Sequence, residues 1–257
     1  MPKYQKTHYV LSLFVCLIPL ALVAGAAVME FFIISSCFTF FFLNSRKIGL
    51  DYYKKIYFII FILFSFYLIL SSILSENVFN SLRNTLLYFR FGVLVILILY
   101  LLDNFEKFKI LFFYSITATL VIVIFASIVD FFLFYDHFKV TRLSGLFGEE
   151  QVQGSYLLRI TPLFILTYFY NKEFLNKKFF IIFYLILSLV FILIILSAER
   201  SSIFLLFIGI FLTFFFLKIK IKKIILCCIF FSSILASVFI LNPTVKERVI
   251  DKTYNSF

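Results

Sequence analysis

Long apolar runs follow one another along almost the whole chain, and they limit it to a helical membrane protein. A helix needs about 20 apolar residues to cross a bilayer, because the hydrocarbon core is about 30 Å thick and each residue rises about 1.5 Å. The mean hydropathy is +1.10 and only 14% of the residues are charged, so most of the chain cannot be the surface of a soluble globule. The sequence predicts an all-α polytopic membrane protein with nine candidate spans, at residues 9–26, 28–43, 56–74, 84–102, 110–130, 152–170, 179–197, 201–217 and 224–241.

The first two runs are continuous, and residues 9–43 would measure roughly 52 Å as a single helix. That length is too long for one span and tight for two. Gly25 and Glu30 favour a turn inside the run, so we expect two spans here, whereas a single span would leave eight in all. We expect residues 1–257 to form one transmembrane helical domain that keeps its signal-like N-terminus as the first helix.

The positive charges predict the orientation of the chain. A cytoplasmic N-terminus places 15 Lys and Arg residues and four Asp and Glu residues on the inner segments, and nine of each sign on the outer side. Short inner loops are enriched in Lys and Arg, so we expect a cytoplasmic N-terminus and an outer C-terminus. The net charge of +11 is then explained by topology and by attraction to anionic membrane lipid, and no nucleic-acid partner is implied.

The two sides differ in the kind of cation. Of the 15 inner cations 14 are Lys, whereas six of the nine outer cations are Arg. Arginine offers a planar fork of donors that matches phosphate oxygens two at a time. Every even-numbered helix also begins on the outer side, where helix N-termini can bind anions. The sequence therefore predicts anion recognition by outer arginines, which are Arg83, Arg90, Arg142, Arg159, Arg200 and Arg248.

Arg90 and Arg159 are expected to lie within the membrane. Arg83 and Arg90 are seven residues apart, so they share a face of the fourth helix. Arg159 lies about two turns into the sixth helix. Burying an ionisable group unpaired is expensive, so Arg90 and Arg159 are candidates for function. For Arg159 the alternative is an internal ion pair, with Asp130 or Glu150 as the partner.

The remaining candidates lie at helix ends or in a loop. Arg200 begins the eighth helix, where a cation opposes the helix dipole unless Glu199 or a ligand joins it. Arg142 lies in an outer loop beside Glu149 and Glu150, where solvation or a local salt bridge is the favoured alternative. Tight turns at Gly145 and Gly148 would let the polar groups of this loop line an outward-facing cavity.

These residues together resemble the O-antigen ligase and O-antigen polymerase superfamily of bacterial envelopes. The resemblance rests on the loop Arg-Leu-Ser-Gly-Leu-Phe-Gly at 142–148, on Ser-x-x-Arg-Ser at 197–201, and on Asn-Pro-Thr-Val-Lys-Glu-Arg-Val at 242–249. It implies a multi-pass glycosyltransferase of the bacterial inner (cytoplasmic) membrane that works at the periplasmic face without a cofactor or metal. Such enzymes move a glycan from undecaprenyl pyrophosphate to an acceptor hydroxyl, on lipid A core in ligases and on a lipid-linked glycan in polymerases.

In that family outer arginines hold the pyrophosphate, so the resemblance implies this role for Arg142, Arg159 and Arg200. We expect these three to approach one another at the outer face, with Arg83 or Arg90 nearby. The family continues into a long periplasmic loop with a histidine thought to act on the acceptor. We expect residues 242–257 to be the start of that loop, truncated here, which leaves the catalytic residue unknown.

The chain departs from the family in other residues. Its two histidines, His8 on the cytoplasmic flank and His137 in a different outer loop, do not replace the missing one. Gln151 or Gln153 would have to take the place of a polar residue that relatives carry after the loop. Glu199 beside Arg200 is unusual in the family and could partly neutralise it.

Other functions remain open. A transporter or flippase of an anionic lipid-linked substrate would also need outer arginines, but the inner side lacks a matching set. A non-catalytic membrane subunit would use the arginines for packing. Another class of envelope glycosyltransferase would need several acidic metal ligands in an early outer loop, where only Glu30 stands. Cys16, Cys37, Cys227 and Cys228 all lie in apolar runs and show no metal-binding spacing.

Overall fold

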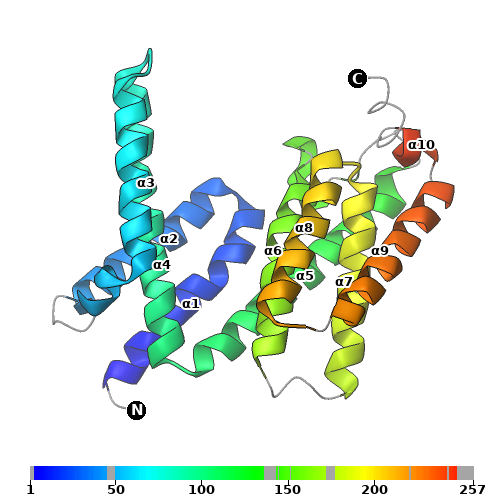
Figure 1. Ribbon diagram of the computed structural model, residues 1–257, viewed down its shortest axis with the longest axis horizontal. Helices are drawn as coiled ribbons and strands as arrows, with labels where there is room; N and C mark the ends of the chain where they lie inside the picture. Colours follow the sequence, from blue (N-terminus) through cyan, green and yellow to red (C-terminus); the bar gives the residue numbers. More distant parts are fainter. Residues whose placement is uncertain are drawn as a thin grey trace. The chain divides into compact units, whose positions relative to one another are not determined.

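A computed structural model describes residues 3–44, 50–135, 143, 145–150, 152–171, 177–219, 221–241 and 243–247 (Figure 1). Every regular element in these ranges is helical, which confirms the predicted all-α class. The helices are α1 (Lys3–Ala24), α2 (Ala26–Asn44), η1 (Leu50–Lys54), α3 (Ile56–Ile73), α4 (Val78–Asn104), α5 (Lys107–Asp130), η2 (Phe131–Tyr135), η3 (Gly145–Glu150), α6 (Gln153–Tyr170), α7 (Lys177–Leu196), α8 (Arg200–Phe216), α9 (Ile221–Leu241) and α10 (Pro243–Lys246).

Five helices of the described chain are long and apolar enough to cross a membrane. They include Thr7–Ala24, Ile56–Ile73, Val78–Asn104, Lys107–Leu133 and Phe179–Leu196. Shorter apolar helices cover Ala26–Phe41, Arg200–Phe216 and Ile229–Leu241. This is the pattern of a multi-pass membrane protein, whereas the count of nine spans stays a prediction.

The apolar run at residues 9–43 forms two helices. Helix α1 ends at Ala24 and α2 begins at Ala26, and Gly25 between them has a φ of +132°. A side chain is strained at that angle, so glycine allows the chain to reverse here. The two helices pack against each other, as expected from the predicted turn near Gly25.

The chain forms two compact units, residues 1–112 and residues 113–257. The predicted single domain over residues 1–257 and the predicted truncated loop at 242–257 stay predictions, and residues 248–257 lie outside the described residues.

The first unit has its core among α1, α2 and α4. Leu11, Phe40, Leu97 and Leu101 are almost fully buried in this cluster. Helix α3 packs on α4 but stays outside the core, and Ser72 is its one buried residue. The Ser72 and Thr85 hydroxyls lie 2.6 Å apart and join the end of α3 to the first part of α4. Most of α3 therefore faces the surroundings rather than the protein.

The second unit is organised around α6 and α7. The ring of Phe164 on α6 stacks with Phe113 and with Phe183, at centroid distances of 5.8 and 5.0 Å. Tyr168, one turn further along α6, stacks with Phe183 at 4.0 Å. Helix α8 packs on α6, and α9 packs on α7. This aromatic core fixes α6, which carries several of the candidate residues.

Gly92 of α4 provides a test of the packing between α3 and α4. A Cβ added there would lie 2.1 Å from the Phe61 ring, so Gly92→Ala must displace that ring. Overpacking of this kind costs about 1–3 kcal/mol. We expect a lower midpoint of thermal unfolding for the purified protein in detergent.

Gly209→Ala in α8 is the matched control. Its added Cβ would meet only Pro162 Cγ, at 3.4 Å, and alanine is the better helix former by up to about 1 kcal/mol. An unfolding midpoint of Gly92→Ala equal to that of the wild type would contradict the described contact between Gly92 and Phe61.

Candidate functional site

The predicted arginines fall in both units. Arg83 and Arg90 lie on α4 in the first unit, and Arg159 on α6 and Arg200 on α8 lie in the second. Helix α4 begins at Val78, six residues before the expected span, so both of its arginines are helical. Arg142 and Arg248 lie outside the described residues. The predicted convergence of Arg142, Arg159 and Arg200 therefore stays a prediction, as does the placing of Arg83 or Arg90 beside them.

Helices α6 and α8 run parallel and begin at the same end. Ser155 Oγ lies 3.2 Å from Ser202 Oγ, and two turns further along both helices Gly209 faces Pro162. The partners on the two helices thus advance together, and the helices lie side by side in Figure 1. Each helix N-terminus carries unpaired N–H groups and a partial positive charge. The N-termini of α6 and α8 therefore lie close together.

The carboxylate of Glu199 lies between these two helix ends. Its Oε1 accepts the backbone N–H of Gly154, in the first turn of α6, at 3.1 Å. Its Oε2 accepts the hydroxyls of Ser155 and Ser202, each at 2.6 Å. Glu199 is itself the N-cap residue of α8. A carboxylate of the chain itself therefore bonds a backbone N–H in the first turn of α6 and a hydroxyl in the first turn of α8.

Close packing at Gly154 depends on its lack of a side chain. A Cβ there would lie 2.3 Å from the buried Ser197 Oγ and 3.0 Å from Glu199 Cδ. Sequence reasoning considered Glu199 only as a partner of Arg200, and it missed Gly154, Ser155 and Ser202. The available signal was a Gly-Ser pair opening one helix and a Ser-Ser pair in the first turn of the other.

Among the described residues of this unit two arginines are exposed, and they lie close in sequence to Glu199 or to Ser155, which Glu199 contacts. Arg159 follows Ser155 by one turn on α6, and its side chain is exposed. Arg200 directly follows Glu199. The guanidinium groups of Arg159 and Arg200 therefore lie on the two helices whose starts Glu199 joins.

The segment that begins at Gly145 is anchored to α5. Gly145 has a φ of +54°, as its predicted turn requires, and its N–H donates to Asp130 Oδ2 at 2.8 Å. The Asp130 carboxylate is therefore used as a hydrogen-bond acceptor for the backbone of this segment.

Gln153 is fully buried and donates through Nε2 to Ser127 Oγ, so it does not line an outward-facing cavity as expected. Its Oε1 has no hydrogen-bond partner among the described residues. Gln151 and the side chains of Gly148 to Glu150 lie outside the described residues, so their predicted roles stay open.

Arg90 forms an ion pair within the first unit. Its Nη2 donates to the carboxylate of Glu30 on α2, and its Nη1 donates to the Leu87 carbonyl at 2.9 Å. The side chains are 22% and 30% exposed, respectively. The sequence did not indicate a partner for Arg90, and the structure assigns Glu30, 60 residues away. Arg83, by contrast, is exposed.

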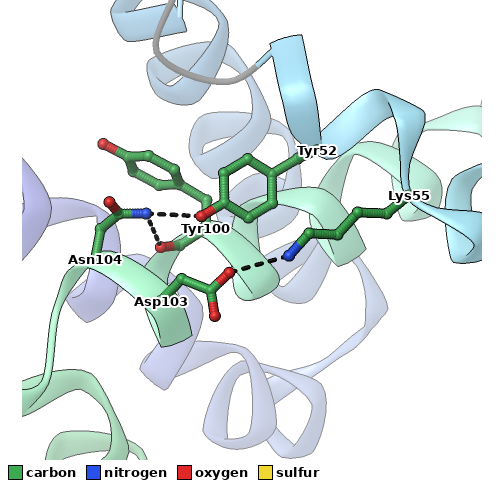
Figure 2. Close-up of polar contacts among 5 residues, drawn as sticks. All are labelled: Tyr52, Lys55, Tyr100, Asp103 and Asn104. Carbon is green, nitrogen blue, oxygen red and sulfur yellow. Dashed lines mark hydrogen bonds and ion pairs between the residues drawn. The ribbon is translucent and has the colours of Figure 1, made fainter.

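A second polar cluster joins η1 to the end of α4 (Figure 2). Asn104 Nδ2 donates to the Tyr52 hydroxyl and to the Tyr100 carbonyl, both at 2.9 Å. Lys55 Nζ lies 3.0 Å from Asp103 Oδ2 and 4.3 Å from the centre of the Tyr52 ring. Burial raises the pKa of the Tyr52 phenol, and the Asp103 carboxylate adds to the rise, so this hydroxyl stays neutral.

His8 takes part in the same cluster. Its Nε2 lies 2.7 Å from the Tyr100 hydroxyl, so the ring links α1 to α4. This contact gives His8 a structural role in the first unit. Within the described ranges no group of three His, Cys, Asp or Glu side chains could hold a metal ion.

Comparison of the chain with protein-family models, with curated proteins and with solved structures finds no match. Functional interpretation therefore rests on the residues and contacts of the chain itself.

The Arg90–Glu30 pair predicts a thermodynamic cycle. Removing one partner of a buried ion pair leaves an uncompensated charge and costs up to about 3–5 kcal/mol, whereas replacing both by apolar residues is often neutral. We expect Glu30→Leu and Arg90→Leu each to lower the unfolding midpoint in detergent, and the double variant to recover most of the loss. Additive losses in the double variant would show that the pair is not coupled.

Glu199 predicts a second effect on stability. Glu199→Gln replaces an acceptor oxygen with an NH₂ donor that faces the donors of Gly154, Ser155 and Ser202. Hydrogen bonds to charged groups contribute about 1.5–3 kcal/mol, so we expect a clear fall in the unfolding midpoint. Glu76→Gln, at an exposed carboxylate between α3 and α4, is the matched control and should change little. Equal midpoints for both variants would exclude a stabilising role for the Glu199 carboxylate.

Proposed function

We propose that this chain is a glycosyltransferase of the O-antigen ligase or polymerase type. It would move a glycan from undecaprenyl pyrophosphate to an acceptor hydroxyl at the periplasmic face of the bacterial inner membrane. The observation that carries the proposal is the meeting of two helix N-termini at Glu199, with Arg159 and Arg200 on the same two helices. An arginine-bearing helix end inside a membrane protein suits a lipid-linked phosphate.

The proposal includes nine spans and a cytoplasmic N-terminus. Support comes from the lysine-rich inner segments and from the helix reversal at Gly25, which sets the order of the later helices. With this orientation α6 and α8 both begin at the periplasmic side. A donor lipid in the outer leaflet would then present its pyrophosphate at their first turns.

Glu199 changes how the pyrophosphate would be bound. Because its carboxylate already accepts the Gly154 N–H and two hydroxyls, those donors are not available to a second anion. Binding would therefore fall to the guanidinium forks of Arg159 and Arg200, with Arg142 as the expected third. The donors that Glu199 occupies would then contribute little to ligand binding.

The proposed reaction does not depend on covalent catalysis by the protein. The acceptor hydroxyl oxygen attacks the anomeric carbon, and the bond from that carbon to the pyrophosphate oxygen breaks with both electrons leaving on the phosphate. Arginines would stabilise the charge that develops there, which is often the largest part of a rate enhancement. The hydroxyl proton passes to a base that is not assigned among the described residues.

A non-catalytic membrane subunit is the second candidate. The ion pair of Arg90 with Glu30 favours it, because the charge of Arg90 is used within the protein. A transporter or flippase of an anionic lipid-linked substrate is a third possibility, but no contact in the described chain favours it over the other two.

Substitution by lysine separates these functions. Arg159→Lys and Arg200→Lys keep the point charge but lose the two-pronged contact with phosphate. In cells expressing the full-length protein we expect each to reduce glycan transfer at least about tenfold, the equivalent of ~1.4 kcal/mol, at unchanged abundance in the membrane.

Lys107→Arg, at an exposed lysine, is the control and should transfer normally. Full transfer by both lysine variants would remove the pyrophosphate role from these residues. Loss of abundance instead of activity would favour the subunit.

A further inference from the structure

The first unit contains an apolar groove between α3 and α4. Its volume is about 270 Å³, and its wall is formed by Tyr52, Phe58, Phe61, Gly92, Ile96 and Leu99, among others. Gly92 carries no side chain beneath the Phe61 ring, which lets that ring lie close to the backbone of α4. Nearly all of the groove surface is apolar, so its occupant must be hydrocarbon.

Helix α3, which forms one side of the groove, has little protein around it. Only 6% of the residues in α3 are buried, and its 18 residues have a mean hydropathy of 2.5. In a bilayer such a helix is surrounded by lipid chains. A second helix is about 10–12 Å across with its side chains, which is too wide to enter a slot of this volume. One lipid chain is narrow enough to enter.

Polar groups lie at the end of the groove where Tyr52 stands. Tyr52 lines the groove and belongs to the cluster of Figure 2, where the Lys55 ammonium lies over its ring and beside Asp103. Lys54 is exposed next to it, and Lys109 is near enough to act on the Asp103 carboxylate. A tyrosine with one apolar and one polar end is typical of a membrane interface.

Charge at this end favours an anionic ligand. By sequence, the described residues 50–55 and 103–109 contain four cations, which are Lys54, Lys55, Lys107 and Lys109, against Asp51, Asp103 and Glu106. Each Lys or Arg near a bilayer surface contributes about 1 kcal/mol toward anionic lipid. The excess of positive charge selects among lipids that the groove alone would not distinguish.

We propose that the groove between α3 and α4 binds one acyl chain of an anionic phospholipid of the surrounding membrane. The headgroup phosphate lies at the Tyr52 end, beside Lys54 and Lys55. This site requires only that α3 and α4 lie in a bilayer. It is independent of the donor-lipid site proposed for the second unit, and Arg159→Lys or Arg200→Lys leaves it intact.

The absence of tryptophan from the sequence allows a direct test. Tyr57→Trp reports from the groove and Tyr67→Trp from the same helix outside it, and the two tyrosines are 62% and 64% exposed. The full chain is reconstituted in vesicles of phosphatidylcholine with a fixed fraction of phosphatidylglycerol. Quenching of the indole is compared when one or the other lipid carries bromine on its acyl chains, at equal brominated fractions.

At the groove position we expect brominated phosphatidylglycerol to quench at least about twofold more than brominated phosphatidylcholine. At the control position the two should quench equally, and taking the ratio at each position cancels its depth in the bilayer. Adding Lys54→Gln and Lys55→Gln should bring the groove ratio to that of the control, whereas Lys218→Gln, at an exposed lysine of the second unit, should not.

Three results would overturn the proposal. Equal quenching by both lipids at Tyr57→Trp would show ordinary lipid contact without a site. Weak quenching by either lipid there, while Tyr67→Trp is quenched normally, would place a second copy or another protein in the groove. A lipid preference that survives Lys54→Gln and Lys55→Gln would remove the headgroup assignment.

Discussion

Hydrocarbon offers no hydrogen-bond partner, and this constraint governs every polar group of the helices. Backbone groups are satisfied within each helix, and polar side chains must find partners inside the protein. Hydroxyls in the helices do so by donating one turn back, as Ser36 does to the Phe32 carbonyl and Thr161 to the Leu157 carbonyl. Groups with more charge need partners from other helices, and those partners determine which helices pack together.

The Glu199 cluster shows what such a partner achieves. Two parallel helices bring like partial charges together at their starts, which is unfavourable without an anion between them. Glu199 supplies the anion, and its contacts with Gly154 and Ser155 hold α6 in register with α8. Arg159 and Arg200 are carried on the helices so joined. The Glu199 carboxylate therefore helps to set the register of the two helices that carry these arginines.

Local features of the sequence predicted local features of the fold well. The break at Gly25, the start of α6 and α8 within one residue, and the turn at Gly145 all follow from the residues at those places. Distant pairings could not be predicted. Arg90 and Glu30 are 60 residues apart, and Gly154 and Glu199 are 45 apart. Hydrophobic periodicity reports which face of a helix is apolar, but nearly every face here is apolar, so it does not select the neighbour.

The two units meet the same constraint with different chemistry. In the second, a carboxylate between helix ends concentrates polar groups around two arginines. In the first, Arg90 is paired with Glu30, and other polar groups gather where Asn104, Tyr52 and Tyr100 join η1 to α4. In the first unit, Arg90 and Lys55 are both paired with carboxylates, from Glu30 and Asp103, respectively. The two cations differ in what they bond: the guanidinium of Arg90 donates to two acceptors at once, the Glu30 carboxylate and the Leu87 carbonyl, whereas the Lys55 ammonium acts as a point charge.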